Sequence, residues 1–185
     1  MGSLLGRVAL GLFVLGSAVL QQPPKKPVEA TTFAPIGFFN KNCYYCHPKD
    51  GAGYPADFGK GYDEEKLYDR LLDMTEEKAR VALTDKELDV LASWMRALMK
   101  KEPHVAWVET KGAELTFEAT IGATVTATVK GSAVAVRQDK GLWKLMRPAG
   151  SVAGDVVVTA TLQRKSTKLA LKSAASSHTK RLGSR

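Results

Sequence analysis

Hydrophobic residues follow three patterns along the chain, and each predicts a different kind of segment. Residues 8–20 form an unbroken run of apolar and small side chains. Residues 33–101 place their apolar side chains at helical spacing, with polar and glycine-rich stretches between them. Residues 104–172 alternate apolar and polar side chains with a period of two, which is typical of half-buried strands. The patterns therefore predict helices first and strands second.

In the helical region we expect helices at 33–43, 63–73 and 85–101. The last of these has the strongest start signal, because Thr84 and Glu87 form a capping box, in which each side chain satisfies a backbone N–H of the other. Thr75, which two glutamates follow, is interpreted as the N-cap of a further short helix.

In the alternating region we expect about seven short strands, near 104–110, 113–119, 124–130, 132–137, 141–146, 155–163 and 167–172. Lys130-Gly131 and Asp139-Lys140-Gly141 have the composition of hairpin turns. Short antiparallel strands of this number predict a small all-β sandwich, Ig-like in its strand count, or a barrel.

The motif with the clearest chemistry is Cys43-Tyr44-Tyr45-Cys46-His47. A C-x-x-C-H run is the attachment signature of haem c, in which both thiols form thioether bonds and the histidine is the proximal iron ligand. A redox C-x-x-C pair gives no reason for the histidine. A zinc site lacks its fourth ligand, because the chain has only these two cysteines. The motif therefore predicts one covalent haem c.

With these residues in place, the segment resembles a class I, single-haem c-type cytochrome domain. The matching residues are Phe39, the C-x-x-C-H motif, Gly53-Tyr54-Pro55, Met74 and the helix with Trp94. The resemblance covers about seventy of the 185 residues. It implies an all-α, cytochrome c-like domain over 33–102, and the alternating pattern predicts the β domain after it, over 103–172.

The resemblance also implies the iron ligands. Met74 is expected to be the sixth ligand, opposite His47, and the carbonyl of Pro55 is expected to accept a hydrogen bond from His47 Nδ1. The sequence departs from the family where Thr75 follows the methionine in place of the usual proline. His104 and an open site remain alternatives for the sixth position, whereas Met95 and Met99 lie on an apolar stripe, where core packing is expected. Met146 belongs to the β domain. His104 and His178 are lone histidines outside the haem segment, and such residues are more often surface residues than ligands.

The N-terminal run predicts export. Residues 1–18 have the form of a signal peptide with a cut after Ala18, and an uncleaved membrane anchor is the alternative. Residues 19–32 are rich in proline and polar side chains, and we interpret them as an extended linker. Attachment of haem to C-x-x-C-H proteins takes place outside the cytoplasm, so the motif agrees with a periplasmic or equivalent location.

Charge is distributed unevenly along the chain, which has a net charge of +8. Residues 33–101 carry 11 Lys and Arg against 12 Asp and Glu, while residues 163–185 carry seven Lys and Arg and no acid. The basic pI therefore comes from the C-terminal end. That end has no aromatic residue to stack on a base, so a nucleic-acid partner is not expected. The flexible tail, 173–185, could instead contact an anionic surface.

These observations predict an electron carrier and not an enzyme, because no catalytic arrangement or second haem motif occurs in the sequence. A redox partner protein is implied, and its identity is open. The β domain is expected to dock a partner or to build a homo-oligomer or an oxidoreductase complex. A chain that ends near Lys101 is therefore expected to keep its haem. The alternatives are a haem c subunit of a larger oxidoreductase and a haem sensor with a labile sixth ligand.

Overall fold

The computed structural model describes residues 32–55 and 57–171. The helical part consists of α1 (Pro35–Asn42), the 3₁₀ turn η1 (Lys49–Gly51), α2 (Glu64–Asp73), the π-helical turn η2 (Met74–Lys78) and α3 (Asp85–Lys100). No helix of these described residues is long and apolar enough to cross a membrane. The predicted signal peptide 1–18, nearly all of the linker 19–32 and the tail 173–185 lie outside the described residues.

The β part follows at once, in eight strands and one short turn. These are β1 (Val105–Lys111), β2 (Glu114–Ala119), β3 (Thr124–Val129), β4 (Ser132–Val134), β5 (Val136–Asp139), β6 (Leu142–Met146), the 3₁₀ turn η3 (Ala153–Asp155), β7 (Val156–Leu162) and β8 (Lys165–Ala170). They form two antiparallel four-stranded sheets, with the orders β1-β2-β6-β5 and β4-β3-β7-β8. The prediction of helices followed by a small antiparallel β domain is therefore confirmed.

The two sheets pack face to face around one apolar core. Its fully buried members come from both sheets, among them Leu115 and Phe117 of β2 and Val156 and Val158 of β7. Trp107 is also buried in this core, as its alternating position predicts. Each sheet keeps its own strand pairing, so the arrangement is a sandwich and not a closed barrel.

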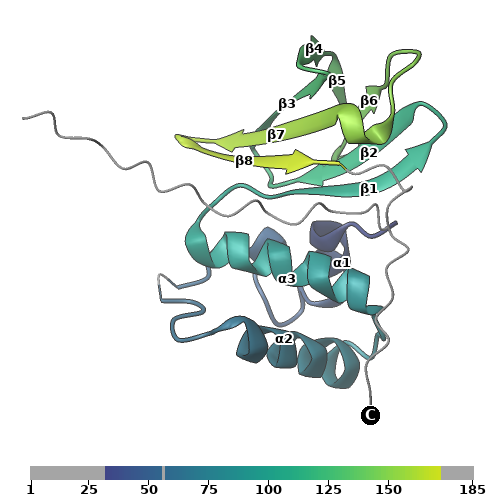
Figure 1. The fold of residues 1–185 in the computed structure, drawn as a ribbon. Helices are drawn as coiled ribbons and strands as arrows, with labels where there is room; N and C mark the ends of the chain where they lie inside the picture. The colour runs from purple at the N-terminus through teal and green to yellow at the C-terminus, as the bar shows by residue number, and fades with distance from the viewer. Residues whose placement is uncertain (1–31, 56, 172–185) are drawn as a thin grey trace, which may run out of the picture.

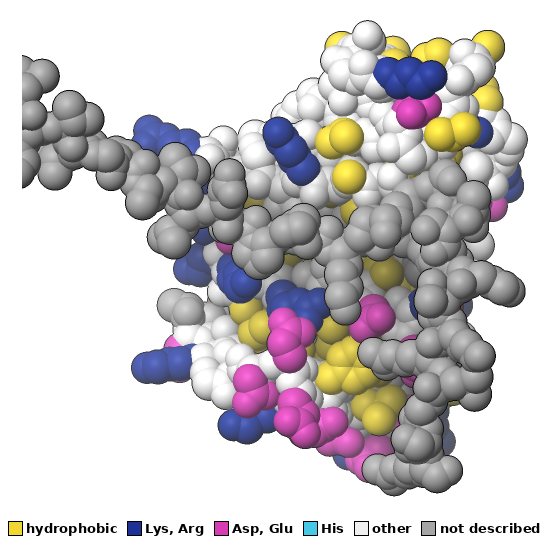
Figure 2. Space-filling view, viewed as in Figure 1, with side chains coloured by type: hydrophobic (Ala, Val, Ile, Leu, Met, Phe, Trp, Pro, Cys, Tyr) yellow, Lys and Arg dark blue, Asp and Glu magenta, His cyan; other side chains and the backbone are white. Residues whose placement is uncertain are grey.

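The helical part covers one outer face of this sandwich. Ala106 of β1 belongs to the helical core, together with Phe39, Leu91 and Trp94. Figure 1 shows α3 beneath β1, with α2 on the side of α3 that faces away from the sheets. In Figure 2 acidic side chains gather over the lower, helical part of the molecule, in agreement with the charge count for 33–101.

Several local signals in the sequence correspond to the structure. Thr84 and Glu87 form the predicted capping box, in which the Thr84 N–H donates to Glu87 Oε2 at 2.8 Å. The turn at Lys130-Gly131 has positive φ at both residues, and so does Lys140-Gly141, as two-residue hairpin turns require.

Three local expectations are corrected. Thr75 does not cap a new helix: its buried hydroxyl donates back to Leu71 O at 2.9 Å, and η2 continues directly from α2. The strand expected at 132–137 is split into β4 and β5, because the chain passes from one sheet to the other at Ala135. The basic C-terminal stretch also begins inside the fold, since Lys165 and Lys168 belong to β8.

Candidate functional site

The C-x-x-C-H motif begins where α1 ends. The Cys43 N–H donates to Phe39 O at 2.8 Å, which makes Cys43 the C-cap of the helix. The Cys43 carbonyl then accepts the N–H of Cys46 at 3.2 Å and the N–H of His47 at 3.1 Å. The motif is therefore a hydrogen-bonded turn that continues from α1, so the position of α1 sets the position of both thiols and of the imidazole.

A second pair of hydrogen bonds closes the loop after the motif. Asn40 Nδ2 donates to Asp50 Oδ1, and the Asp50 N–H donates to Asn40 Oδ1 at 2.7 Å. Asp50 has a positive φ of 58°, a conformation that aspartate tolerates better than most residues. Neither residue is predicted from the sequence pattern. Their only signal is that Asn40 and Asp50 lie three positions outside the motif on either side.

Two aromatic rings lie beside the imidazole of His47. Its ring centroid lies 5.9 Å from that of Phe39 and 5.8 Å from that of Tyr54. Tyr54 stacks on Phe58 at 3.8 Å, and Phe39 meets Trp94 edge-on at 4.9 Å. Apart from His47 itself, these side chains belong to the helical core or pack against it. The histidine is therefore held at the edge of an apolar, aromatic environment.

The ionisable groups of the motif influence one another. Burial raises the pKa of the Cys43 thiol, and the nearby Cys46 adds to this increase. Burial raises the pKa of Tyr54 to about 12, with a smaller contribution from Cys43. Both cysteines are free thiols, and Cys46 is exposed. Cys43, Cys46, His47 and Tyr54 thus form one cluster, which we call the attachment cluster.

The other two predicted site residues lie outside this hydrogen-bonded turn. Met74 is half-buried and begins the π-helical turn η2, a local geometry that is frequent at functional sites. Pro55 is exposed, and its carbonyl accepts the Phe58 N–H at 3.0 Å. Iron ligation by Met74 and the hydrogen bond from His47 to Pro55 both remain predictions.

The competing methionines are packed as expected. Met95 is buried in the helical core. The sulfur of Met99 occupies the space beside Gly59, where an added Cβ would lie 1.8 Å from it. His104, in contrast, is not a surface residue: it is buried at the junction of the two parts, and its N–H donates to Thr120 Oγ1 at 2.8 Å.

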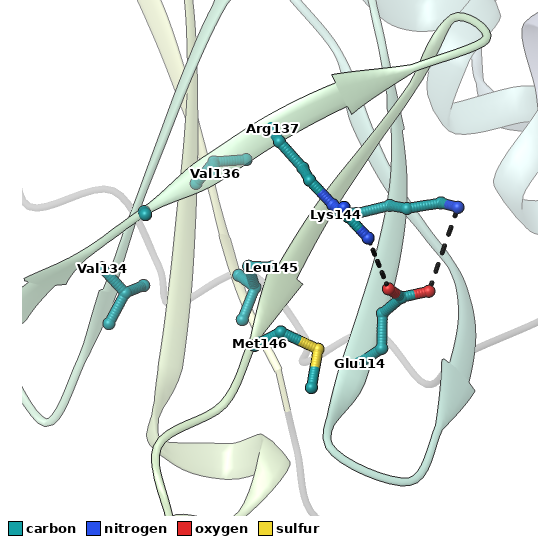
Figure 3. A pocket seen from close by; sticks show the side chains of 8 residues that line it. Glu114, Val134, Val136, Arg137, Lys144, Leu145 and Met146 are labelled. Carbon is teal, nitrogen blue, oxygen red and sulfur yellow. Dashed lines mark hydrogen bonds and ion pairs between the residues drawn. The ribbon is translucent and has the colours of Figure 1, made fainter.

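Two cavities lie outside the attachment cluster or at its border. One, of about 310 Å³, separates the helical part from the sandwich and includes Tyr54 and Phe58 in its wall. The other, of about 470 Å³, lies in the sandwich where β4 passes into β5. Figure 3 shows its polar side, where Glu114 forms ion pairs with Arg137 at 3.2 Å and with Lys144 at 4.0 Å. Met146, which is 59% exposed, also lines this cavity.

No family model matches the chain, and no curated protein is significantly similar to it. In residues 32–55 and 57–171, moreover, no group of three or more His, Cys, Asp or Glu side chains could hold a metal ion. These residues contain three α-helices, and most of the remaining regular structure is β. These findings overturn the resemblance to a class I cytochrome domain. The physical reason is that a short motif fixes the spacing of a few neighbouring residues and does not determine the fold of the chain around them.

Proposed function

We propose that the chain carries one haem c, bound covalently through Cys43 and Cys46, and that it transfers electrons. In this proposal His47 and Met74 would hold the haem iron. The observation that carries it is the attachment cluster: two free, adjacent thiols and an imidazole follow one another in a single turn at the end of α1. Attachment through the two thiols and His47 rests on these residues and needs no family relationship, whereas Met74 as the second iron ligand is a separate prediction that substitution tests.

The donor chemistry of the cluster fits this group. Thioether attachment would not require Cys43 and Cys46 to converge on a metal, because the thiols would bond to the porphyrin edge, while the iron would be held by His47 and Met74. Both thiols are free, with Cys46 exposed and Cys43 half-buried, and the aromatic rings beside His47 supply apolar surface of the kind that a porphyrin needs. When bound, haem supplies an iron atom that accepts and releases one electron.

The chain's own residues then have separate tasks. Phe39 and Tyr54 contact the imidazole of His47, and the Asn40–Asp50 hydrogen bonds hold the loop that contains it. A thioether ligand from Met74 would raise the redox potential, which suits transfer between proteins. Such a role makes the protein an electron carrier and not an enzyme.

The sandwich supports docking or assembly. Its strand order is that of Ig-type constant domains with one strand, β4, added. The edge strands β4 and β5 are short and mostly exposed, and they border the 470 Å³ cavity with its exposed Met146 (Figure 3). An edge of this kind can pair with a strand of another chain. In the alternative role, a haem c subunit of a larger oxidoreductase, the same edge would form the contact with the other subunits.

The proposal also implies where the protein is located and what its basic tail binds. Covalent haem attachment implies an exported protein, either periplasmic or anchored by residues 1–18. A basic tail beyond Leu171 would favour an acidic partner or anionic lipid headgroups, with an attraction of about 1 kcal/mol per basic residue.

Haem staining after denaturing electrophoresis tests the proposal. The chain is produced in cells that attach haem to exported C-x-x-C-H proteins, beside a Cys43→Ala/Cys46→Ala variant. Haem should migrate with the wild-type polypeptide and should be absent from the band of the double variant. Release of all haem from the wild type into acidified organic solvent would contradict covalent attachment.

A further inference from the structure

Helix α1, which leads into the attachment cluster, begins without a cap of its own. Its N-cap residue is Ala34, which has no side chain that could accept a hydrogen bond, and Pro35 follows at the first helical position. Proline has no N–H, so Ile36 and Gly37 carry the first backbone donors that need a partner. A helix end of this kind is normally capped by Ser, Thr, Asp or Asn.

Both donors are satisfied by one side chain from the sandwich. The Ile36 N–H donates to Glu118 Oε2 at 2.7 Å, and the Gly37 N–H donates to Glu118 Oε1 at 2.8 Å. Glu118 lies on β2 and is only 7% exposed. A Cβ at position 37 would lie 3.3 Å from Oε1, so the glycine leaves room for the carboxylate.

Burial and hydrogen bonding have opposite effects on the ionisation of Glu118. Burial raises the pKa of Glu118, the hydrogen bonds from Ile36 and Gly37 oppose the increase, and the charge of Asp50 adds to it. A buried carboxylate is costly unless it accepts hydrogen bonds, and the N-terminus of a helix favours a negative charge. Loss of the carboxylate would leave buried backbone donors without an acceptor.

A positively charged side chain of the sandwich contacts the C-terminus of another helix, α3. Lys165 Nζ, from β8, donates to Lys100 O at the C-terminus of α3, at 2.9 Å. A cation at this end complements the helix dipole, although the exposed lysine contributes less than a buried pair would. The sandwich thus supplies an anion to the start of one helix and a cation to the end of another.

We propose that Glu118 is a positioning residue for the haem-attachment turn: as a cap supplied by the sandwich, it fixes α1 and therefore the thiols and the imidazole that follow. This inference rests on the proposed haem c function. The cap and the attachment turn are separated only by α1, which has eight residues. The last turn of α1 is hydrogen-bonded directly to Cys43 and, through Asn40, to Asp50.

The first test measures the cap in the full-length protein, through hydrogen exchange of the Ile36 and Gly37 amides. Glu118→Gln replaces one acceptor oxygen by an NH₂ group, which cannot accept from a backbone N–H. Exchange should become about tenfold faster at the amide that loses its acceptor, the ratio that corresponds to the loss of one helix cap. Glu114→Gln is the matched control, because Glu114 lies on the same strand and pairs only with Arg137 and Lys144 in the described structure. Unchanged exchange in Glu118→Gln would overturn the proposal.

The second test supplies a local cap. Ala34 has an extended backbone, as N-cap residues have, so Ala34→Asp can accept from the same amides. The double variant Ala34→Asp/Glu118→Gln should recover slow exchange at Ile36 and Gly37. If it does not, Glu118 stabilises the fold in some other way than as a cap, and the proposal fails.

The third measurement links the cap to the haem. The redox potential should shift in Glu118→Gln, return towards the wild-type value in the double variant, and remain unchanged in Glu114→Gln. Faster amide exchange with an unchanged potential would show that the cap does not position the attachment turn, and would overturn the proposal. A wild-type chain without haem would instead refute the proposed function, and the exchange experiment would still decide whether Glu118 is the cap.

Discussion

The carboxylate of Glu118 accepts the N–H of Ile36 from 82 positions earlier in the chain, at 2.7 Å. This contact joins the sandwich to the first helix, and Ala106 extends the same junction into the helical core. The two parts therefore share buried contacts, which a free-standing docking domain would not need.

A chain that ends at Lys101 should consequently be less stable than the intact protein. It loses the Glu118 cap, the burial of Ala106 and the Lys165 contact, and it exposes the helical surface that the sandwich covers. We expect the free energy of unfolding of the helical part to fall by at least about 2 kcal/mol, from the cap and the apolar area together. Urea titration followed by helical circular dichroism measures this.

The sequence alone predicts that such a chain keeps its haem, on the view that the β domain serves docking only. A truncated chain as stable as the helical part of the intact protein would support that view and would count against a structural role for the sandwich.

The stability of the protein should depend on the ionisation of Glu118. Burial raises its pKa above the ordinary carboxylate value, so the folded state holds a proton that the unfolded state has already released. The free energy of unfolding should therefore fall as the pH rises from the ordinary value through the raised one, and should be highest below both. Subtracting the profile of Glu118→Gln from that of the wild type isolates this contribution. A difference that rises over the same window would show that the pKa is lowered instead.

Met74 can be tested against two internal controls. If it is the second iron ligand, Met74→Ala should abolish the methionine–Fe(III) charge-transfer band and lower the redox potential. Met95→Ala and Met99→Ala should keep the band, although each should reduce stability by about 2–5 kcal/mol, because both side chains fill packed positions. Loss of the band in either control, but not in Met74→Ala, would assign the ligand elsewhere. Carbon monoxide binding to the reduced wild type would indicate an open or labile position and favour a sensor.

Tyr54 provides a probe of the attachment cluster itself. Ultraviolet titration of the haem-free chain should show one tyrosine that ionises near pH 12, because burial, and to a lesser degree Cys43, raise its pKa. Tyr54→Phe should remove that step. Thioether formation at Cys43 abolishes the thiolate, so the pKa should fall slightly in the haem-loaded chain and remain above 10, since burial is the larger cause. A step that Tyr54→Phe leaves in place would belong to another tyrosine.

The sequence predicts best the features whose cause is local. The capping box at Thr84 and the two-residue turn at Lys130 depend on neighbours within a few positions, and both occur as predicted. Thr75 also has the pattern of a cap, but it lies inside η2, which continues directly from α2, and its hydroxyl donates to the carbonyl oxygen of Leu71. The local sequence therefore predicts that a side chain can form a capping hydrogen bond more reliably than it predicts which backbone group that side chain will bond.

Features that depend on distant partners could not be predicted. Glu118 occupies a polar position in an alternating strand, and alternation alone assigns such a position to solvent. Only the fold reveals that a helix covers it. The family resemblance failed for a related reason, because C-x-x-C-H and a methionine at the expected spacing fix neither the number of helices nor the domain that covers them.

The absence of a local cap at Ala34 has a consequence for the evolution of the chain. A helical part that exists without a sandwich must satisfy the same two amides by itself, so its sequence should carry Ser, Thr, Asp or Asn at this position. In relatives that retain the sandwich, the side chains at positions 34 and 118 should covary, with a capping residue at one site whenever the other has lost its acceptor. Selection would then act on the two positions together. Once residue 34 had changed to alanine, the helical part would depend on the sandwich for the cap of its first helix.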